Sequence, residues 1–297
     1  MEKIVPHFWF DTDAKEAVDF YMSLFEDSEI RTVQELEGTP SGENTVAYEF
    51  NLAGQHFAAL NGGPNFKMNS SISMTVHGKT KEEVQMLWDE LAEGGHILMP
   101  LKAYDFSEFY GWVEDRYGLS WQLIYTEGTN VKQKIVPSLT FSGTATGKAR
   151  DAITYYTNIF QNGEIFEVHE YESGQASSEE AQIAHATFEI MGLEMIAADH
   201  PETVDYQFNE GVSLMILCVT QAEIDYYWDK LSAAIEAEQC GWVQDKFGVS
   251  WQIVPMNLSE LLSTGTRKQI NAVTEEFLQM EKINVERLER AWEKAAE

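Results

Sequence analysis

Cysteine is nearly absent from this sequence, which has only Cys218 and Cys240 in 297 residues. Two cysteines so far apart along the chain are too few to build a zinc cluster. A redox or catalytic thiol needs an activating environment, and neither position predicts one. We therefore expect both thiols to be buried and unreactive.

Long apolar segments are also missing. The first ten residues, MEKIVPHFWF, are charged early and contain neither an extended apolar run nor a small-residue cleavage site. No segment predicts a transmembrane helix. The hydrophobic share of 44% is typical of a chain that packs globular cores, so we expect a cytoplasmic protein.

Positive charge is scarce as well. Lys and Arg together number 20 against 49 Asp and Glu, which gives a formal net charge of −29. The sequence has no basic stripe that could follow a phosphate backbone. Nucleic acid and anionic membranes are therefore excluded as expected partners, and the acidity mainly favours solubility.

What the sequence does contain is an internal repeat. The tetrapeptide KIVP occurs at residues 3–6 and again at 134–137. Each copy precedes apolar residues at the spacing of an amphipathic helix. These residues are Ala14, Ala17, Val18, Tyr21, Leu24 and Phe25 in the first half and Ala149, Ala152, Ile153, Tyr156, Ile159 and Phe160 in the second. Each half is therefore predicted to begin with a strand and a helix.

Further strands and a second helix follow in both halves. Residues 46–60 and 185–198 each predict two strands around a glycine turn. SISMTV and VSLMILCV predict the next strands, and each is followed by a helical pattern of apolar residues. Each half thus contains two strand–helix–strand–strand–strand units, written βαβββ below.

The longest repeated motif closes each half. GWVEDRYGLSWQLI at 111–124 returns as GWVQDKFGVSWQIV at 241–254, identical at eight of fourteen positions. Asp at the first and Gly at the fourth turn position predict a hairpin with a type I turn. Its tryptophans, Trp112, Trp121, Trp242 and Trp251, could stack on a flat ligand, although a place in the core is favoured. The motif supplies no nucleophile or acid–base pair, so we interpret it as architecture.

Two features break the symmetry of the repeat. Residues 96–110 are about ten residues longer than their counterpart, and we predict a loop that covers something in the first half alone. Beyond residue 255 the pattern becomes helical, with one apolar stripe and a last helix that Asn284 can cap. The stripe consists of Ile270, Val273, Phe277 and Met280. We expect this tail to pack against the domains.

Taken together, the motifs resemble the vicinal oxygen chelate superfamily, which includes glyoxalase I, bleomycin resistance proteins and dioxygenases. FWFDTDAKEAVDFY, ALNGGPNFKMN and LQMEKINVERLE are similar to its PhnB-like branch, whose label is 3-demethylubiquinone-9 3-methyltransferase. The resemblance covers nearly the whole chain in two copies. It implies an α+β fold of two tandem domains, each made of paired βαβββ units that form a cupped mixed sheet, plus a C-terminal helical tail. The predicted ranges are 1–127, 133–256 and 257–297, joined by a polar linker. They imply an intramolecular pseudo-dimer and leave a homodimer of whole chains open.

Metal-dependent members of the superfamily hold one divalent ion inside the cup, with ligands from the first and last strands of each unit. The corresponding positions are His7, Ala59, Ser71 and Gln122 in the first half and Ser138, Ala197 or Ala198, Ser213 and Gln252 in the second. Only His7 is a strong ligand, whereas an enzyme needs about three or four imidazole, carboxylate or thiolate donors. We expect His7 to face Gln122, no metal and no other cofactor. A glycine-rich turn for S-adenosylmethionine is not found.

Strand alternation predicts which face each neighbouring residue occupies. It places Phe57, Ala59 and Asn61 on one face, which we expect to be the cup, and His56 out of phase with them. The predicted ligand-binding residues are His7, Trp9, Phe57, Asn61, Ser71, Trp112, Gln122, Ser138, Asp199, Ser213, Trp242 and Gln252.

Three functions agree with this sequence. The first is metal-free binding of an unknown small molecule. The second is an enzyme of the superfamily that acts on an oxygenated or aromatic substrate in the N-terminal half, where His7 would be a lone base or hydrogen-bond donor. The third is a non-catalytic interaction or regulatory module. A half-buried strand histidine satisfied by its neighbours is the favoured interpretation of His7.

Overall fold

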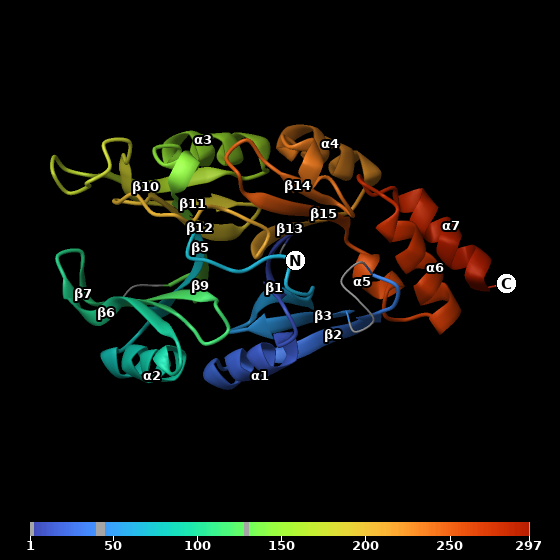
Figure 1. Cartoon of the computed structure of the whole chain (residues 1–297), viewed down its shortest axis with the longest axis horizontal. Coiled ribbons are helices and arrows are strands. Elements are labelled where there is room, and N and C mark those ends of the chain that lie inside the picture. Colours follow the sequence, from blue (N-terminus) through green and yellow to red (C-terminus); the bar gives the residue numbers. More distant parts are fainter. Residues whose placement is uncertain (1–2, 40–44, 128–130, 297) are drawn as a thin grey trace. The chain divides into compact units, whose positions relative to one another are not determined.

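A computed structural model of the chain describes residues 3–39, 45–127 and 131–296. The chain divides into two compact units. Unit 1 comprises residues 1–67 and 209–297, and unit 2 comprises residues 68–208. Each unit has its own sheet (Figure 1). Unit 2 is thus one continuous stretch of chain, whereas unit 1 is assembled from both ends of the sequence.

Unit 1 is built on a seven-stranded mixed sheet in the order β14-β15-β13-β1-β4-β3-β2. Its elements are β1 (Ile4–Phe10), α1 (Ala14–Leu24), β2 (Glu29–Leu36), β3 (Thr45–Leu52), β4 (Gln55–Asn61), β13 (Val212–Cys218), α4 (Gln221–Leu231), η2 (Ile235–Ala237), β14 (Trp242–Gln244) and β15 (Ser250–Pro255). Helix α1 packs on β3 and β4, and α4 packs on β13, β14 and β15.

Unit 2 is built on an eight-stranded mixed sheet in the order β10-β11-β12-β9-β5-β8-β7-β6. Its elements are β5 (Ile72–Gly78), α2 (Lys81–Ala92), β6 (His96–Tyr104), β7 (Ser107–Glu114), β8 (Ser120–Tyr125), β9 (Ile135–Phe141), η1 (Gly143–Ala145), α3 (Ala149–Ile159), β10 (Glu164–Glu170), β11 (Ile183–Ile190) and β12 (Leu193–Asp199). Helix α2 covers β5 to β8, and α3 covers β10 to β12.

Each sheet combines one repeat unit from each half of the sequence. Three of the four units have the predicted βαβββ order, whereas the last one, β13-α4-β14-β15, has one strand fewer. Strand β1 pairs antiparallel with β13, so that His7 lies opposite Ser213. Strand β9 pairs in the same way with β5, where Ser138 lies opposite Ser73. The α+β class, the two mixed sheets and the tandem repeats are confirmed, but the paired units come from different halves. Repeats of one pattern offer equivalent edges, so the sequence alone does not say which copy pairs with which.

The repeated hairpin is built around a buried aspartate. Asp115 accepts hydrogen bonds from the backbone N–H groups of Tyr117 and Leu119 and from the indole of Trp121. Asp245 makes the same three bonds in unit 1. Trp121 and Trp251 are both fully buried. The predicted architectural role therefore holds for this tryptophan of each hairpin, because its N–H is consumed in closing the turn.

Residues 96–110, predicted as a loop, form a hairpin instead. Strand β6 pairs with β7 at the edge of the unit 2 sheet, with register shifts along the ladder. The long apolar and aromatic run supports a strand, whereas the prediction used only the length difference from the second half. In unit 1 the counterpart is reduced to η2 and the three-residue β14.

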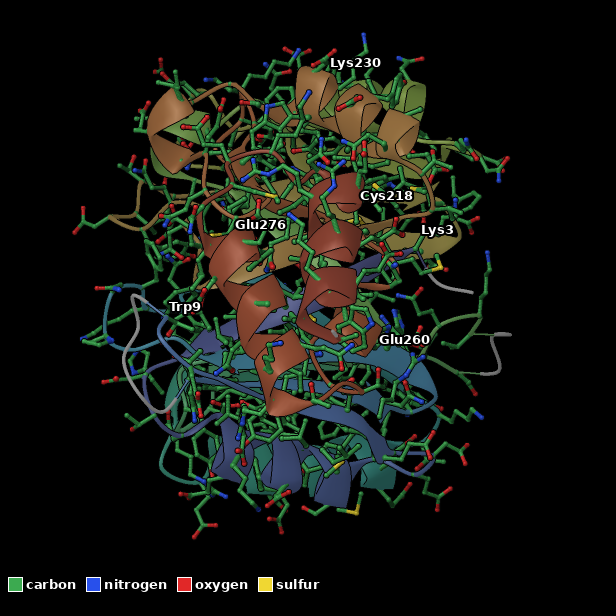
Figure 2. The ribbon with its side chains drawn as sticks, turned by 90° about the vertical axis from the view of Figure 1, so that its right-hand side faces the viewer. Lys3, Trp9, Cys218, Lys230, Glu260 and Glu276 are labelled. Carbon is green, nitrogen blue, oxygen red and sulfur yellow. The ribbon has the colours of Figure 1, made fainter. Side chains whose placement is uncertain are left out.

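The tail is helical, as predicted, and belongs to unit 1. It consists of α5 (Leu258–Leu261), α6 (Arg267–Leu278) and α7 (Val285–Ala296). Figure 2 shows α6 and α7 side by side, and Glu260 marks α5. A capping box between Thr266 and Gln269 starts α6, and the Asn284 side chain accepts from the Arg287 N–H at the start of α7. None of the described helices is long and apolar enough to cross a membrane.

Both thiols are buried, as the sequence predicted. Burial raises the pKa of Cys218 to about 12 and that of Cys240 to about 11. A thiol is nucleophilic only as the thiolate, so both cysteines are inert near neutral pH.

Candidate functional site

Each sheet has one face covered by its two helices and an opposite face, called the inner face below. Strand register assigns side chains to these faces. Ser73 pairs with Ser120 and Thr75 with Gln122 across parallel strands, so all four side chains lie on one face of the unit 2 sheet. Trp121 and Leu123 alternate with them and point to α2. The inner face of unit 2 is therefore unusually polar for a buried sheet.

A chain of neutral hydrogen bonds runs across this inner face. The Tyr110 hydroxyl donates to Gln122 Oε1 at 2.7 Å, and Gln122 Nε2 donates to Ser73 Oγ at 2.8 Å. Beside it, Thr75 Oγ1 and Ser138 Oγ lie 2.6 Å apart. Burial raises the pKa of Tyr110 far above its ordinary value, so its hydroxyl stays protonated. We call these five residues the unit 2 network.

An aromatic ring borders the network. Trp112 lies on β7 directly opposite Gln122 and is half-buried. Its indole N–H donates to Ser120 Oγ at 2.8 Å, and Ser120 also contacts Ser70 Oγ at 3.0 Å. These bonds fix the plane of the ring at the side of the network. A flat molecule placed on the network would meet both hydrogen-bonding groups and a π-face.

Two histidines add neutral imidazoles to the same inner face. His77 follows Thr75 by two residues on β5, and burial lowers its pKa to about 4, helped by repulsion from His185 and Lys134. Burial also lowers the pKa of His185 on β11. At neutral pH both rings are uncharged, and each presents one donor and one acceptor nitrogen.

The matching inner face of unit 1 is arranged differently. Gln252 Nε2 donates to Ser213 Oγ at 3.0 Å, which repeats the amide–hydroxyl bond of unit 2. His7 replaces Ser138, and its Nδ1 lies 3.5 Å from Ser213 Oγ. Burial lowers the pKa of His7 to about 4, so this imidazole is neutral. Two aromatic side chains, Trp242 and Trp9, fill the space beside this histidine.

These rings contact one another edge to face. The Trp242 ring centroid lies 5.7 Å from that of His7 and 6.1 Å from that of Trp9. Trp9 donates its indole N–H to Gly63 O at 2.8 Å and packs against Phe66. Gly62 lies so close beneath the Trp9 ring that a Cβ there would overlap it. The NGGP segment is thus a platform for Trp9.

Register also corrects several sequence expectations. His7 pairs with Ser213 and shares a sheet with Gln252, whereas Gln122, its expected neighbour, belongs to the sheet of unit 2. On β5 the inner-face counterpart of Ser213 is Ser73, and Ser71 lies two residues away. The sequence prediction aligns β5 with β13 through a serine alone. SISMTV contains two serines, two residues apart, so both fall on the same face and either can be matched to Ser213.

Phe57, Asn61 and Asp199 point to the helical side of their sheets. Phe57 stacks on Phe8, and Asn61 Oδ1 accepts from the first N–H of α1, that of Ala14, at 2.8 Å. Asp199 accepts from four backbone N–H groups, including those of Gly147 and Ala149 at the start of α3. Both polar residues are therefore helix caps.

The same phase error affected His56. His7 pairs in parallel with Ala58, so Ala58 and His56 share its face, while Ala59 points away. In unit 2, Ile196 pairs with Ser138 and Ala198 with Thr140, so these two residues share the inner face and Ala197 points away. Alternation along a strand shows which residues share a face. Pairing with a residue of known orientation, such as His7, is needed to tell the inner face from the helical face.

Sequence reasoning missed Ser73, Thr75, Tyr110, His77 and His185. Thr75 and His77 follow Ser73 at strand spacing, so this alternation could have identified them. The expectation of a loop over residues 96–110 places Tyr110 on neither face of a sheet. The other predicted residues that lie on inner faces are Trp112, Gln122 and Ser138 in unit 2 and His7, Trp9, Ser213, Trp242 and Gln252 in unit 1.

A family model described as 3-demethylubiquinone-9 3-methyltransferase matches residues 2–124 and again 133–254. The chain belongs to this family. The predicted resemblance to the PhnB-like branch is thereby confirmed. No curated protein matches the chain.

The solved structures to which this chain is similar match either one half or most of it. A PhnB protein from Bacillus cereus is 40% identical over 42% of this chain and 100% of its own, with a TM-score of 0.40. A protein from Staphylococcus aureus is 36% identical over 42% of this chain and 97% of its own, with a TM-score of 0.18. A glyoxalase I mutant from Zea mays is 9% identical, covers 86% of this chain and 94% of its own, and has a TM-score of 0.54. This last similarity concerns the fold alone.

The vicinal oxygen chelate fold implies a divalent ion on the inner face, but the residues present do not fit one. The side chains at the relevant positions are His7, Ser213 and Gln252 in unit 1 and Ser138, Ser73 and Gln122 in unit 2. One imidazole with hydroxyls and amides is a weak donor set for Zn²⁺ or Fe²⁺. Across residues 3–39, 45–127 and 131–296, no three His, Cys, Asp or Glu side chains are grouped to hold a metal.

Proposed function

We propose that the protein binds a small, uncharged, oxygen-bearing aromatic molecule on the inner face of unit 2, without a metal ion. The observation that supports this is the unit 2 network, in which Tyr110, Gln122 and Ser73 are linked by neutral hydrogen bonds beside the Thr75–Ser138 pair. Trp112 supplies the aromatic wall.

The charge of the ligand follows from the chemistry of these groups. The network contains no ionised side chain, and His77 is neutral because burial lowers its pKa to about 4. A charged ligand placed there would lose its hydration without gaining a counter-charge. Hydroxyl, amide and imidazole groups instead match carbonyl, hydroxyl and ether oxygens. The family description names a methyltransferase of 3-demethylubiquinone-9, whose quinone ring is also flat, uncharged and oxygen-bearing.

Calorimetric titration with coumarin tests the proposal, because coumarin is flat, neutral and carries a carbonyl acceptor. Naphthalene, which has a similar shape without oxygen, and coumarin-3-carboxylate, which adds a charge, are the controls. Coumarin should bind more tightly than either. Equal affinity for all three compounds, or no binding of any, would contradict the proposal and favour the interaction module.

Matched variants locate the site. Gln122→Leu removes the central group of the network, and the loss of one or two hydrogen bonds should weaken coumarin binding by roughly tenfold. Gln252→Leu makes the same change at the matching position of unit 1 and should leave the affinity unchanged. The opposite pattern would place the site in unit 1.

Elemental analysis tests whether the proposed binding is metal-free. Purified protein should contain far less than one divalent ion per chain, and a chelator should leave both its melting temperature and its coumarin affinity unchanged. One tightly held ion that is lost together with stability in His7→Ala would overturn metal-free binding.

A catalytic function in unit 1 is the second candidate, and it rests on His7. This neutral imidazole lies within 3.5 Å of the Ser213 hydroxyl, which also accepts from Gln252. Such a ring is available as a general base without prior deprotonation. Conversion of an oxygenated aromatic compound that is abolished in His7→Gln and retained in Gln122→Leu would favour this candidate.

A further inference from the structure

The C-terminal tail covers part of the inner face of unit 1. Four buried side chains from four strands, Val5, Ala58, Met215 and Val254, form an apolar cluster there, and Leu258 of α5 packs on it with Leu217. In unit 2 no helix is found between β8 and β9 among residues 126–127 and 131–134, which the structure describes, and the counterpart of Val254 is Ile124. Val254 is 3% exposed, whereas Ile124 is half-buried. The difference in burial follows the presence of α5.

Polar residues beneath α5 complete this contact. Gln34 on β2 is buried, and its amide donates to Ser259 Oγ at 2.8 Å. Burial raises the pKa of Glu49 on β3, but hydrogen bonds from His56 and Ser259 outweigh that effect and the net pKa is lowered. Ser259 thus contacts two strands of the inner face at once. A hydroxyl with two partners on the sheet fixes the position of α5 along the strands.

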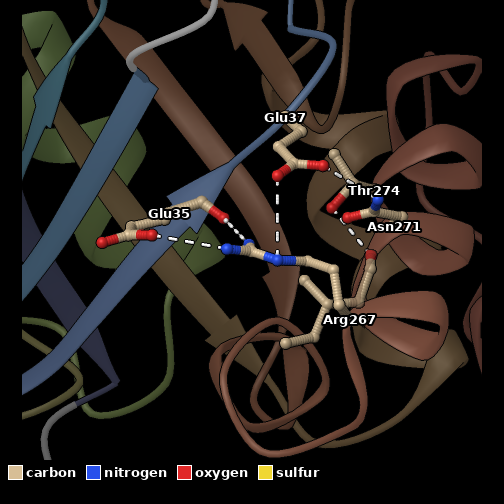
Figure 3. Close-up of polar contacts among 6 residues, drawn as sticks. Glu35, Glu37, Arg267, Asn271 and Thr274 are labelled. Atoms are coloured by element: carbon tan, nitrogen blue, oxygen red, sulfur yellow. Dashed lines mark hydrogen bonds and ion pairs between the residues drawn. The ribbon is translucent and has the colours of Figure 1, made fainter.

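The rest of the tail is fastened on both sides of α5. Arg267 donates to the backbone oxygen of Glu35 at 3.3 Å and lies 3.7 Å from Glu37 Oε1, and Asn271 donates to Glu37 Oε2 at 3.0 Å (Figure 3). After α6 the chain turns and bonds to the hairpin that carries Trp242. There the N–H groups of Cys240 and Gly241 donate to the carbonyls of Met280 and Glu281 at 2.7 and 2.8 Å.

We infer that α5 is a resident occupant of the unit 1 inner face, which closes this copy of the repeat to small molecules and leaves the other copy open. The second clause rests on the function proposed above, whereas the closure does not. Leu258 occupies the apolar part of the face, Ser259 its polar part, and Trp9 and Trp242 the part beside His7. The occupant is covalently attached, so its effective concentration is high and free ligand competes poorly.

The dye 1-anilinonaphthalene-8-sulfonate tests closure independently of coumarin, because it requires only accessible apolar surface. The double variant Leu258→Ala/Ser259→Ala in the full chain should bind one more dye molecule per chain than the wild type. Glu260→Ala is the matched control, since this side chain is exposed on the same helix, and it should match the wild type. A synthetic peptide of residues 256–297 should displace the extra dye.

The outcomes separate closure from unfolding and from the proposed function. No additional dye in the double variant would overturn the inference, as would additional dye that the peptide fails to displace. If the double variant loses its near-ultraviolet circular dichroism, Arg267→Ala/Asn271→Ala is used instead, and hydrogen exchange of residues 258–278 should rise at least tenfold. Unchanged exchange there would also overturn the inference. Failure of the wild type to bind coumarin would refute the proposed function and leave the dye result intact.

Discussion

The two copies of the closing hairpin have the same tryptophan–serine pair, but the pair makes different contacts in each unit. In unit 2 the Trp112 indole donates to Ser120, which also contacts Ser70. In unit 1 the matching Ser250 is 1% exposed and its hydroxyl finds no hydrogen-bond partner among the described residues, because Trp242 packs its ring against His7 and Trp9.

The two hairpins share one hydrogen-bonded frame but have different inner faces. The aspartate turn on the helical side has the same hydrogen bonds in both hairpins. One residue further along each strand, the inner face is free to change, since alternate side chains belong to different environments. Unit 2 uses that freedom for a polar network, and unit 1 uses it for the aromatic cluster of His7, Trp9 and Trp242.

The largest effect is expected from removing the tail. A chain that ends at Met256 would uncover the cluster around Val5 and lose Val273, Met280 and Ile283 from the folded structure. Each fully buried aliphatic side chain contributes about 1.5–3 kcal/mol, so unfolding free energy should fall by roughly 5–10 kcal/mol. Chemical denaturation with separate probes for each unit would measure it. An unchanged melting temperature would show that docking contributes nothing.

The hairpin aspartates should come next, and here the two units should agree. Asp115→Ala and Asp245→Ala each leave two backbone N–H groups and one indole N–H without their buried acceptor. Each substitution should lower the unfolding free energy by about 3–5 kcal/mol, given a cost of roughly 1–3 kcal/mol for each buried group left unsatisfied. Urea titration of both variants measures the cost, and a difference above about 2 kcal/mol would show that the frame is not equivalent.

Lowering the pH should reduce the stability of both units, because each contains a buried neutral histidine. His7 in unit 1 and His77 in unit 2 have a pKa of about 4 in the folded protein, against 6.5 ordinarily. The unfolded chain therefore binds more protons between these values, and stability present above about pH 6.5 is lost as the pH falls toward 4. Each histidine should account for about 2–3 kcal/mol of that loss.

Unfolding at pH 7, 6 and 5 measures this slope, and His7→Gln or His77→Gln should each reduce it. Carboxylates with lowered pKa values, such as Glu49 and Glu223, add the same sign of effect only below their ordinary value of 4.5. Two variants with wild-type slopes between pH 7 and 5 would mean that the histidines are protonated in the folded state.

The smallest effect separates the two serines. Ser120→Ala removes the acceptor of the Trp112 indole and should lower stability by about 1–3 kcal/mol. Ser250→Ala removes a hydroxyl that has no partner among the described residues, so its effect should lie within about 0.5 kcal/mol of zero. Thermal unfolding of both variants under one buffer measures the difference. Equal losses would indicate that Ser250 is hydrogen-bonded after all.

Elements that follow from local sequence patterns could be predicted from the sequence. Contacts that depend on which distant strands pair could not. The helices, the glycine-turn hairpins around Gly54 and Gly192, and the tail follow from local periodicity and turn chemistry. The face of Phe57 or Asn61 depends on which side of the sheet its helix packs, and His7 meets Ser213 only because distant strands join. Tyr110 required knowledge that a long insertion forms strands.

The discontinuity of unit 1 has a consequence for synthesis. A ribosome releases residues 68–208 as one uninterrupted stretch, so unit 2 has all its strands before β13 has been made. Strand β1 emerges first, yet its antiparallel partner lies about 200 residues later in translation, and until then one edge of β1 has no ladder partner. The aromatic strand IVPHFWF therefore keeps one unpaired edge for most of translation, and such an edge is prone to pair with the wrong strand.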